Sequence, residues 1–247
     1  MLSTADSNLT ITVVFDNNRY MQDCRTDWGF SALITGTEKT ILFDTGADGR
    51  MLLDNMKKLH IDTETIDSVV LSHKHQDHTG GLNAFLNRNN NVKVYLLDAF
   101  GVEIKNRIKA FGAEPVSITG PVEICPSVSS TAARGRLIKE QALMINTDKG
   151  IILITGCAHP GILKIAEFAG DYNEHKILLA IGGFHLEWST SSKIQKIINH
   201  LKQLPVHYAA PAHCTGDKAR DMFRRHFKDN YIETGAGRAI RISELKL

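Results

Sequence analysis

The stretch LSHKHQDHTGG (residues 71–81) gathers three histidines and one aspartate at the end of an apolar segment. Residues two apart in an extended chain point the same way, so His73 and His75 can offer their imidazoles to one metal ion. If the backbone turns into a helix at the glycine pair, Asp77 and His78 can face a second metal position close by. The stretch therefore predicts a site for two metals, and the alternative is a solvated polar turn.

Further side chains of metal-binding type follow three later apolar runs. Cys157 and His159 come just after ILIT, His185 follows LLAIGG, and His213 follows YAAPA. Because strand ends that face one way are where α/β proteins assemble sites, we expect these side chains to join the first cluster. This favours the metal site over the polar turn. A water bridging two metals becomes hydroxide near neutral pH, so the arrangement suits hydrolysis.

The rest of the chain predicts two blocks in which strands come first and strands then alternate with helices. The first block begins with strands over residues 9–16, 30–35 and 39–46 and a helix over 48–60. The other predicted strands are 67–72, 91–97, 114–119, 121–126, 141–147, 150–156, 176–183 and 206–212. The other predicted helices are 80–87, 99–112, one that begins after 161, 194–204 and one that begins at about 217. Since helices on both sides must bury their apolar faces, we expect an α/β (α+β) fold with two central sheets flanked by helices.

Composition narrows the possible partners. The chain has 29 Lys and Arg against 27 Asp and Glu, and no long run of one sign, so neither nucleic acid nor an anionic membrane is an expected partner. No apolar run approaches the length of a membrane span, and the opening MLSTADSNLT lacks the features of a signal peptide, so the cytoplasm is the expected location. No linker interrupts the chain, and residues 1–247 are predicted to form a single domain. No feature indicates an oligomeric state.

The four cysteines, Cys24, Cys125, Cys157 and Cys214, form no CxxC pair. Neither a disulfide framework nor a zinc knuckle is therefore indicated, and a metal site must depend mainly on histidine and carboxylate.

Five motifs resemble the metallo-β-lactamase superfamily. They are LFDTG (42–46), LSHKHQDHTGGL (71–82), LITGCAHPGI (153–162), IGGFHL (181–186) and PAHCTG (211–216). The first long motif has the H-x-H-x-D-H pattern of the superfamily. The others resemble its predicted metal-dependent hydrolase branch, named for a dihydropterin ribofuranosylaminobenzene phosphate synthase of methanopterin biosynthesis. The resemblance runs from about Thr10 to Ile242.

The resemblance implies an αββα sandwich with a dinuclear site at the edge of its two mixed sheets. His73 and His75 match ligands of the first metal, Asp77 and His78 match ligands of the second, and His213 matches the last histidine of the second site. Asp44 of LFDTG matches an aspartate that orients a ligand histidine. The alternative for Asp44 is an aspartate that stabilises the turn before Gly46.

This chain departs from the superfamily pattern at two places, and its His185 belongs to the signature that resembles the branch. No histidine lies between residues 97 and 156, so His159 is assigned to the first metal, with a structural histidine as the alternative. Cys157 stands where an aspartate is common; its thiolate would be a good zinc or iron ligand, or it is a small buried residue. His185 is expected to face the substrate, as a hydrogen-bond donor or general acid, and the alternatives are a metal ligand and a core histidine.

The leading hypothesis is a dinuclear metal-dependent hydrolase in which a metal-bound hydroxide attacks a small-molecule ester. The favoured ester is a phosphoester or phosphodiester. The cofactors of this hydrolase would be two divalent ions, zinc first, with iron or manganese as alternatives, and its catalytic residues Asp77 and His185. A second hypothesis is a pterin phosphate synthase that uses the metals as Lewis acids. Further alternatives are a diiron redox or oxygen-binding protein and a metal-binding relative without catalytic activity.

Overall fold

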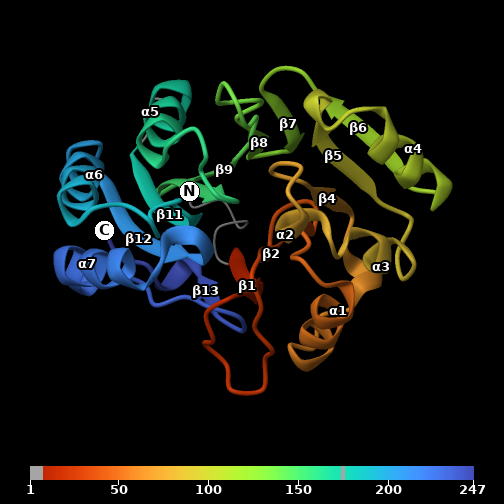
Figure 1. The fold of residues 1–247 in the computed structure, drawn as a ribbon, viewed down its shortest axis with the longest axis horizontal. Helices are drawn as coiled ribbons and strands as arrows, with labels where there is room; N and C mark the ends of the chain where they lie inside the picture. Colours follow the sequence, from red (N-terminus) through yellow and green to blue (C-terminus); the bar gives the residue numbers. More distant parts are fainter. Residues whose placement is uncertain (1–7, 174–175) are drawn as a thin grey trace.

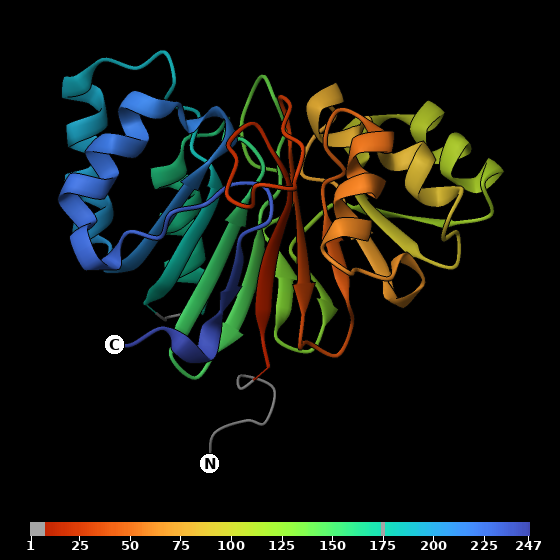
Figure 2. The same cartoon turned by 90° about the horizontal axis from the view of Figure 1, so that it is seen from below.

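Two β-sheets lie against each other in the computed structural model, and helices cover the outer face of each sheet (Figures 1 and 2). The structure describes residues 8–173 and 176–247. Residues 1–7, which form most of the opening segment that was expected to lack a signal peptide, lie outside the described residues. The arrangement confirms the expected αββα sandwich with mixed sheets.

The first sheet has the strand order β13-β1-β2-β3-β4-β5-β6, and β3 to β6 run parallel. Its strands are β1 (Thr10–Asp16), β2 (Phe30–Thr35), β3 (Ile41–Phe43), β4 (Ser68–Val70), β5 (Lys93–Leu97), β6 (Glu114–Ile118) and β13 (Ala239–Arg241). On its outer face lie the helices α1 (Gly49–Lys58), α2 (Gln76–Thr79), α3 (Leu82–Leu86) and α4 (Val102–Ala110).

The second sheet has the order β12-β11-β10-β9-β8-β7, and β10 to β12 run parallel. Its strands are β7 (Val122–Cys125), β8 (Val128–Ser130), β9 (Leu143–Thr147), β10 (Gly150–Thr155), β11 (Ile177–Gly183) and β12 (Val206–Ala212). The helices α5 (Ile162–Asn173), α6 (Ser191–Gln203) and α7 (Asp217–Phe227) cover its outer face (Figure 1). Short 3-10 helices follow several elements, and η3 (His213–Thr215) comes directly after β12.

Three hydrophobic clusters explain the four layers. The central cluster joins the facing sides of both sheets, with Ile34 and Phe43 from the first and Ile154 and Ile181 from the second, all fully buried. A second cluster packs the second sheet against α5, α6 and α7, and a third packs the first sheet against α1, α3 and α4. Strands that are apolar on both faces, such as Gly150–Thr155, are therefore buried from both sides.

The elements differ from the predictions at a few places that bear on the site. The strand expected over 39–46 ends at Phe43, because Asp44 adopts a left-handed backbone with φ 55°. The helix expected over 80–87 is α3 over Leu82–Leu86, and a short helix that was not predicted, α2, precedes it over Gln76–Thr79. The strands β8 and β13 are not predicted, as each has only three residues.

Within the described residues, no helix is both long enough and apolar enough to cross a membrane.

Candidate metal centre

The predicted metal ligands lie at one edge of the two sheets, where the parallel strands end. His73 and His75 follow β4, Asp77 and His78 are in the short helix α2, and His213 begins η3 after β12. Cys157 and His159 follow β10 in the second sheet. Both sheets therefore contribute to the site, and the structure brings all seven proposed ligands together in two groups.

The first group consists of His73, His75 and His159, whose ligand atoms all lie within 4.8 Å of one another. Nε2 of His73 lies 3.0 Å from Nδ1 of His75. The rings of His73 and His159 have centroids 4.6 Å apart and cross nearly edge to face. Three imidazole nitrogens converge, which is a common ligand set for a catalytic zinc.

The second group consists of Asp77, His78, Cys157 and His213, again within 4.8 Å. Nε2 of His78 lies 3.1 Å from the sulfur of Cys157 and 3.5 Å from Oδ2 of Asp77. The same carboxylate oxygen lies 3.2 Å from Nε2 of His213. This set mixes two nitrogens, one oxygen and one sulfur, which suits a metal of intermediate softness such as zinc.

In four of the histidines, the ring nitrogen Nδ1 lies within hydrogen-bonding distance of a neighbouring oxygen. The pairs are His73 with Ser72 Oγ (2.9 Å), His78 with Asp44 Oδ2 (2.7 Å), His159 with Glu140 Oε2 (2.8 Å) and His213 with Asn17 Oδ1 (2.9 Å). In the neutral form of such a ring the oxygen at Nδ1 accepts the single ring proton, so Nε2 keeps a lone pair for a metal.

Asp44 links the first two of these pairs. Oδ2 of Asp44 accepts a hydrogen bond from the hydroxyl of Ser72 at 2.7 Å, and Oδ1 accepts one from the backbone N–H of Ser72. Because the only hydroxyl proton of Ser72 points at Asp44, its oxygen accepts from Nδ1–H of His73. One fully buried carboxylate thus fixes the rings of His73 and His78, one from each ligand group.

Glu140 is a functional residue that the sequence analysis missed. It is 1% exposed, and its carboxylate accepts hydrogen bonds of 2.8 Å from the backbone N–H groups of Cys157, Ala158 and His159, besides the one from the His159 ring. The local sequence RLIKEQAL offers no sign of this, since the groups that Glu140 holds lie 17 to 19 residues further on.

Asn17, just after β1, is a further residue of the site. Its side chain oxygen holds Nδ1 of His213, which lies 196 residues away. The adjacent Asp16 is fully buried, and its Oδ2 lies 3.3 Å from the backbone nitrogen of His213. The end of β1 therefore positions the last histidine. Trp28, 43% exposed, lies on the same ring with its centroid 4.9 Å away.

The electrostatics keep the first group ready to bind a metal. Burial and the neighbouring imidazole of His78 lower the pKa of His73 to about 2, so this ring is neutral near pH 7. Burial alone would raise the pKa of Glu140, but its hydrogen bond from His159 and the nearby His73 lower the pKa to about 2. A negative charge on Glu140 therefore lies behind the first group, in which the ring of His73 is neutral.

The second group holds a proton where a metal would bind. Burial lowers the pKa of His78, but the carboxylates of Asp44 and Asp77 outweigh burial and raise the pKa to about 10. The imidazoles of His78 and His213 hold the pKa of Asp77 well below its usual range, against the effect of burial. A metal ion on Nε2 of His78 would replace this proton and satisfy the same carboxylate.

One buried atom tests whether the residues fit metal ions. Nε2 of His213 is fully buried and has no hydrogen-bond partner among the described residues, although Oδ2 of Asp77 lies nearby. An unpaired buried nitrogen is costly unless something binds it. Nε2 is also the nitrogen that Asn17 leaves free, and it faces a carboxylate, an imidazole and a thiol. The donor set therefore fits a divalent cation.

His185 and Cys214 extend the site on one side. The ring of His185 follows β11 and lies 4.5 Å from that of His159, between centroids. Cys157, His185 and Cys214 form a third group of close donor atoms, and Cys214 is buried with its sulfur 3.6 Å from the carbonyl oxygen of Cys157. The thiol of Cys214 raises the pKa of His185. His185 is exposed, unlike the core histidine that was its alternative.

Gly156 is required where the two sheets meet behind the site. A Cβ at this position would lie 2.2 Å from Oγ of Ser72 and 2.9 Å from Oδ2 of Asp44. We expect Gly156→Ala to lower the free energy of unfolding by about 1–3 kcal/mol, as overpacking does, and to lower the metal content. Denaturant titration and elemental analysis measure the two effects. At Gly120 a Cβ would meet nothing within 4 Å, so Gly120→Ala is the control, and equal behaviour of the two variants would contradict the prediction.

Comparison with known proteins points to one family. The family model described as "Metallo-beta-lactamase superfamily" matches residues 29–160, which include the first ligand group and part of the second. An uncharacterized protein of Methanocaldococcus jannaschii is 30% identical, with 94% of this chain and all of that protein covered.

Two further relatives extend over almost the whole chain. The 7,8-dihydropterin-6-methyl-4-(beta-D-ribofuranosyl)-aminobenzene-5'-phosphate synthase of Methanocaldococcus jannaschii is 28% identical, and the alignment covers 97% of this chain and 98% of the synthase. A crystal structure of a metal-dependent hydrolase of the beta-lactamase superfamily superposes with a TM-score of 0.81 and 27% identity. It covers 94% of this chain and 98% of the other.

Proposed function

This chain belongs to the metallo-beta-lactamase superfamily and is an enzyme of that superfamily, and we propose that it hydrolyses a small-molecule ester with two divalent metal ions. A phosphoester or phosphodiester is the proposed substrate, and zinc is the proposed metal. The observation that carries the proposal is the adjacency of two donor groups, whose nearest rings, His73 and His78, have centroids 4.2 Å apart. In the proposal His73, His75 and His159 hold one ion, and Asp77, His78, Cys157 and His213 hold the other.

Metal ions bound at such a pair of sites supply Lewis acidity and a water that loses its proton near neutral pH. The chain supplies the rest. Asp44, Glu140 and Asn17 fix the rings, so the donor nitrogens need no rearrangement when the ions bind. The carboxylate of Asp77 is charged and 19% exposed at its side chain, so it can accept a hydrogen bond from the attacking water.

His185 is proposed to face the substrate from the side of His159. Its ring is exposed, and the thiol of Cys214 beside it favours the protonated ring. A protonated imidazole next to the reaction centre can donate a hydrogen bond to negative charge on the substrate, or a proton to the leaving oxygen.

The proposal is tested by elemental analysis of protein purified without added metal, followed by assays with the identified ion restored. We expect two equivalents of metal and hydrolysis of p-nitrophenyl phosphate esters or of cyclic nucleotides. A protein that carries two equivalents of metal yet turns over no phosphoester, phosphodiester, lactone or thioester would overturn the proposed hydrolase. One equivalent or none would overturn the dinuclear site.

We expect His185→Asn to reduce kcat by about a hundredfold while the metal content stays at the native level, because general acid–base groups contribute effects of this order. Steady-state kinetics and elemental analysis provide the two measurements. His226→Asn, on α7, is the matched control and should leave both unchanged. Loss of metal from the His185 variant would instead make His185 a ligand, against its proposed role.

A second candidate function comes from one relative. The pterin phosphate synthase of Methanocaldococcus jannaschii is aligned over nearly its whole length, which supports Lewis-acid chemistry on a pterin precursor as the alternative. Incubating the metal-loaded protein separately with cyclic nucleotides and with pterin phosphates distinguishes the two. Product from pterin phosphates alone would favour the second candidate.

A further inference from the structure

A cavity of about 680 Å³ opens beside the proposed metal centre. His159 and His185 form its inner side, and the loop from Arg134 to Ile138 forms another wall. The first turn of α5 and Phe168 complete it. A smaller cavity of about 370 Å³ shares His159 and His185 and extends toward α6. A molecule held at the metals would therefore have room to extend past His159.

Among the described residues, those that line these two cavities include cationic side chains and no carboxylate. The cationic side chains are Arg134, Arg136 and Lys164 in the larger cavity and Lys164, Lys193 and Lys196 in the smaller. Neither set of lining residues contains an aspartate or a glutamate. The chain as a whole is nearly neutral, with 29 Lys and Arg against 27 Asp and Glu, so this concentration is local. A cavity of one sign attracts a ligand of the opposite sign.

Two of the lysines stand where a helix disfavours them. Lys164 is the third residue of α5, and Lys193 is the third residue of α6. The first turn of a helix favours acidic residues, because the helix dipole is positive there and Glu can cap the end. Both helices lack an acidic residue in the first turn. A bound anion would offset this local repulsion and would also be attracted by the helix ends.

Arg134 is fixed in place before any ligand binds. Its Nε and Nη2 donate to the carbonyl oxygen of Thr131 at 3.1 and 3.0 Å, and its guanidinium carbon lies 3.5 Å from the ring centroid of Phe168. Nη1 makes no hydrogen bond within the described part of the chain. Such a held guanidinium loses little freedom when it binds an oxyanion.

The loop is attached directly to the metal centre. The backbones of Arg134 and Glu140 exchange two hydrogen bonds, of 2.8 and 3.0 Å, at the base of the loop. Glu140 is the residue that holds His159. The cations of the loop are therefore set at a defined distance from the first ligand group.

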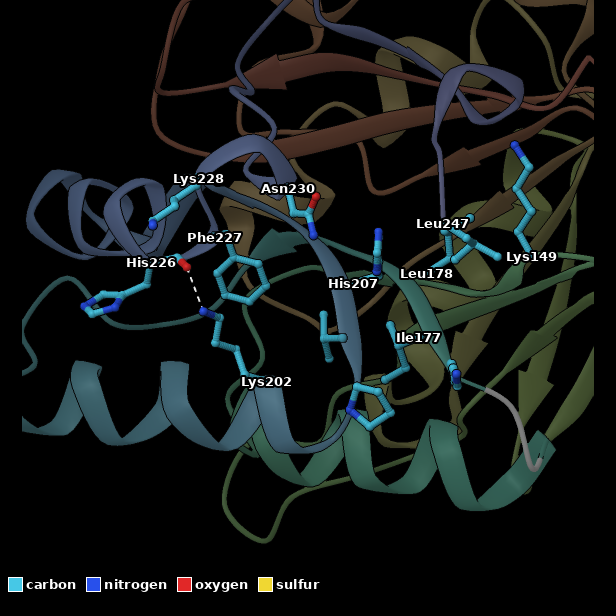
Figure 3. Close-up of a pocket in the computed structure, with 13 residues that line it drawn as sticks. Lys149, Ile177, Leu178, Lys202, His207, His226, Phe227, Lys228, Asn230 and Leu247 are labelled. Carbon is cyan, nitrogen blue, oxygen red and sulfur yellow. Dashed lines mark hydrogen bonds between the residues drawn. The ribbon is translucent and has the colours of Figure 1, made fainter.

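A third cavity, of about 660 Å³, is also rich in lysine, but two of its lysines already donate hydrogen bonds to backbone carbonyl groups. It lies at the amino ends of β11 and β12, the edge opposite the metal centre (Figure 3). Lys202 there donates to the carbonyl oxygen of His226, and Lys149 donates to three carbonyl oxygens of residues 242–245. These two ammonium groups therefore already bind backbone carbonyl groups of the protein itself.

We propose that the cavity beside His159 binds a second phosphate group of the substrate, separate from the ester that is cleaved. This inference rests on the proposed function, because it places the scissile ester at the metals. Arg134, Arg136 and Lys164 are the proposed contacts. The substrate is then a small molecule with at least two phosphates. The ester of one phosphate lies at the metals, and the other phosphate lies in the cavity.

The test compares two chromogenic substrates that differ by one phosphate. They are the p-nitrophenyl ester of thymidine 5′-phosphate and the same ester with an added 3′-phosphate. We expect the native protein to show a KM at least fivefold lower for the second ester, with a similar kcat. Arg136→Gln and Lys164→Gln should remove this preference and leave kinetics on the first ester unchanged. Lys109→Gln, an exposed lysine on α4, is the control and should keep the preference.

A binding measurement separates this inference from the proposed function. Calorimetry of the metal-loaded protein compares thymidine 3′,5′-bisphosphate with thymidine 5′-phosphate. Tighter binding of the bisphosphate that is lost in both glutamine variants supports the second phosphate site even if neither ester is cleaved. Cleavage of both esters with equal KM, or a preference that survives in both variants, would overturn the inference while leaving the hydrolase intact. Equal binding of the two nucleotides would also overturn it.

Discussion

Replacing Asp77 by asparagine is expected to lower kcat/KM about a thousandfold and to remove one of two metal equivalents, since a bound metal contributes several kcal/mol to such a reaction. The carboxylate lies between Nε2 of His78 and Nε2 of His213, at 3.5 and 3.2 Å. Asparagine keeps the shape but loses the charge that would balance a divalent cation. It also removes the carboxylate that faces the attacking water. Elemental analysis and steady-state kinetics measure the two effects.

Asp171→Asn, an exposed aspartate on α5, is the matched control and should behave like the native protein. Full metal content with a thousandfold loss of activity would move Asp77 from ligand to catalytic base alone. Native activity in the Asp77 variant would contradict its place in the site. Adding excess metal separates weakened binding from lost chemistry, because only a weakened site regains its second equivalent.

Replacing Glu140 by glutamine is expected to lower the free energy of unfolding of the metal-free protein by about 2–4 kcal/mol, because a buried charged acceptor is lost. The carboxylate accepts hydrogen bonds from three backbone N–H groups and from the ring of His159. Glutamine turns one of its two oxygens into a donor that faces other donors. The metal affinity of the first ligand group should also fall, by about 10- to 100-fold, as when a partner of a ligand histidine is removed.

Denaturant unfolding of the metal-free variant and metal titration measure these effects. Glu123→Gln, an exposed glutamate on β7 of the same sheet, is the matched control and should leave both values unchanged. A Glu140 variant with native stability and native metal affinity would show that its four hydrogen bonds do not hold the loop after β10.

Local periodicity predicted most of the fold because burial leaves a local pattern in the sequence. Strands buried on both sides, such as β10 and β11, are apolar throughout and were predicted to within one or two residues. The exceptions have a physical cause. β13 has three residues, of which two are exposed, and is a strand only because it pairs with Thr10–Thr12 of β1. The turn at Asp44 shortened β3, and a left-handed backbone leaves no hydrophobic signal.

The site divides in a similar way. The H-x-H-x-D-H motif and the later strand-end residues named the side chains that meet at the sheet edge. Glu140 and the contact of Asn17 with His213 were not predicted, since a hydrogen bond between groups 19 or 196 residues apart leaves no spacing to recognise. The proposed role of Arg134, Arg136 and Lys164 was equally hidden, because they line one cavity only when the loop after β8 packs beside the start of α5.

The sequence by itself determined the class of fold and the chemical types of the donors, because burial patterns and metal-ligand motifs are local. Only the tertiary structure decided which nitrogen of each imidazole faces inward and where positive charge collects beside the donors. Both depend on oxygens and cations that distant segments bring to the edge of the two sheets. Contacts of that kind are set by how the sheets pack, and neighbouring residues in the chain do not reveal them.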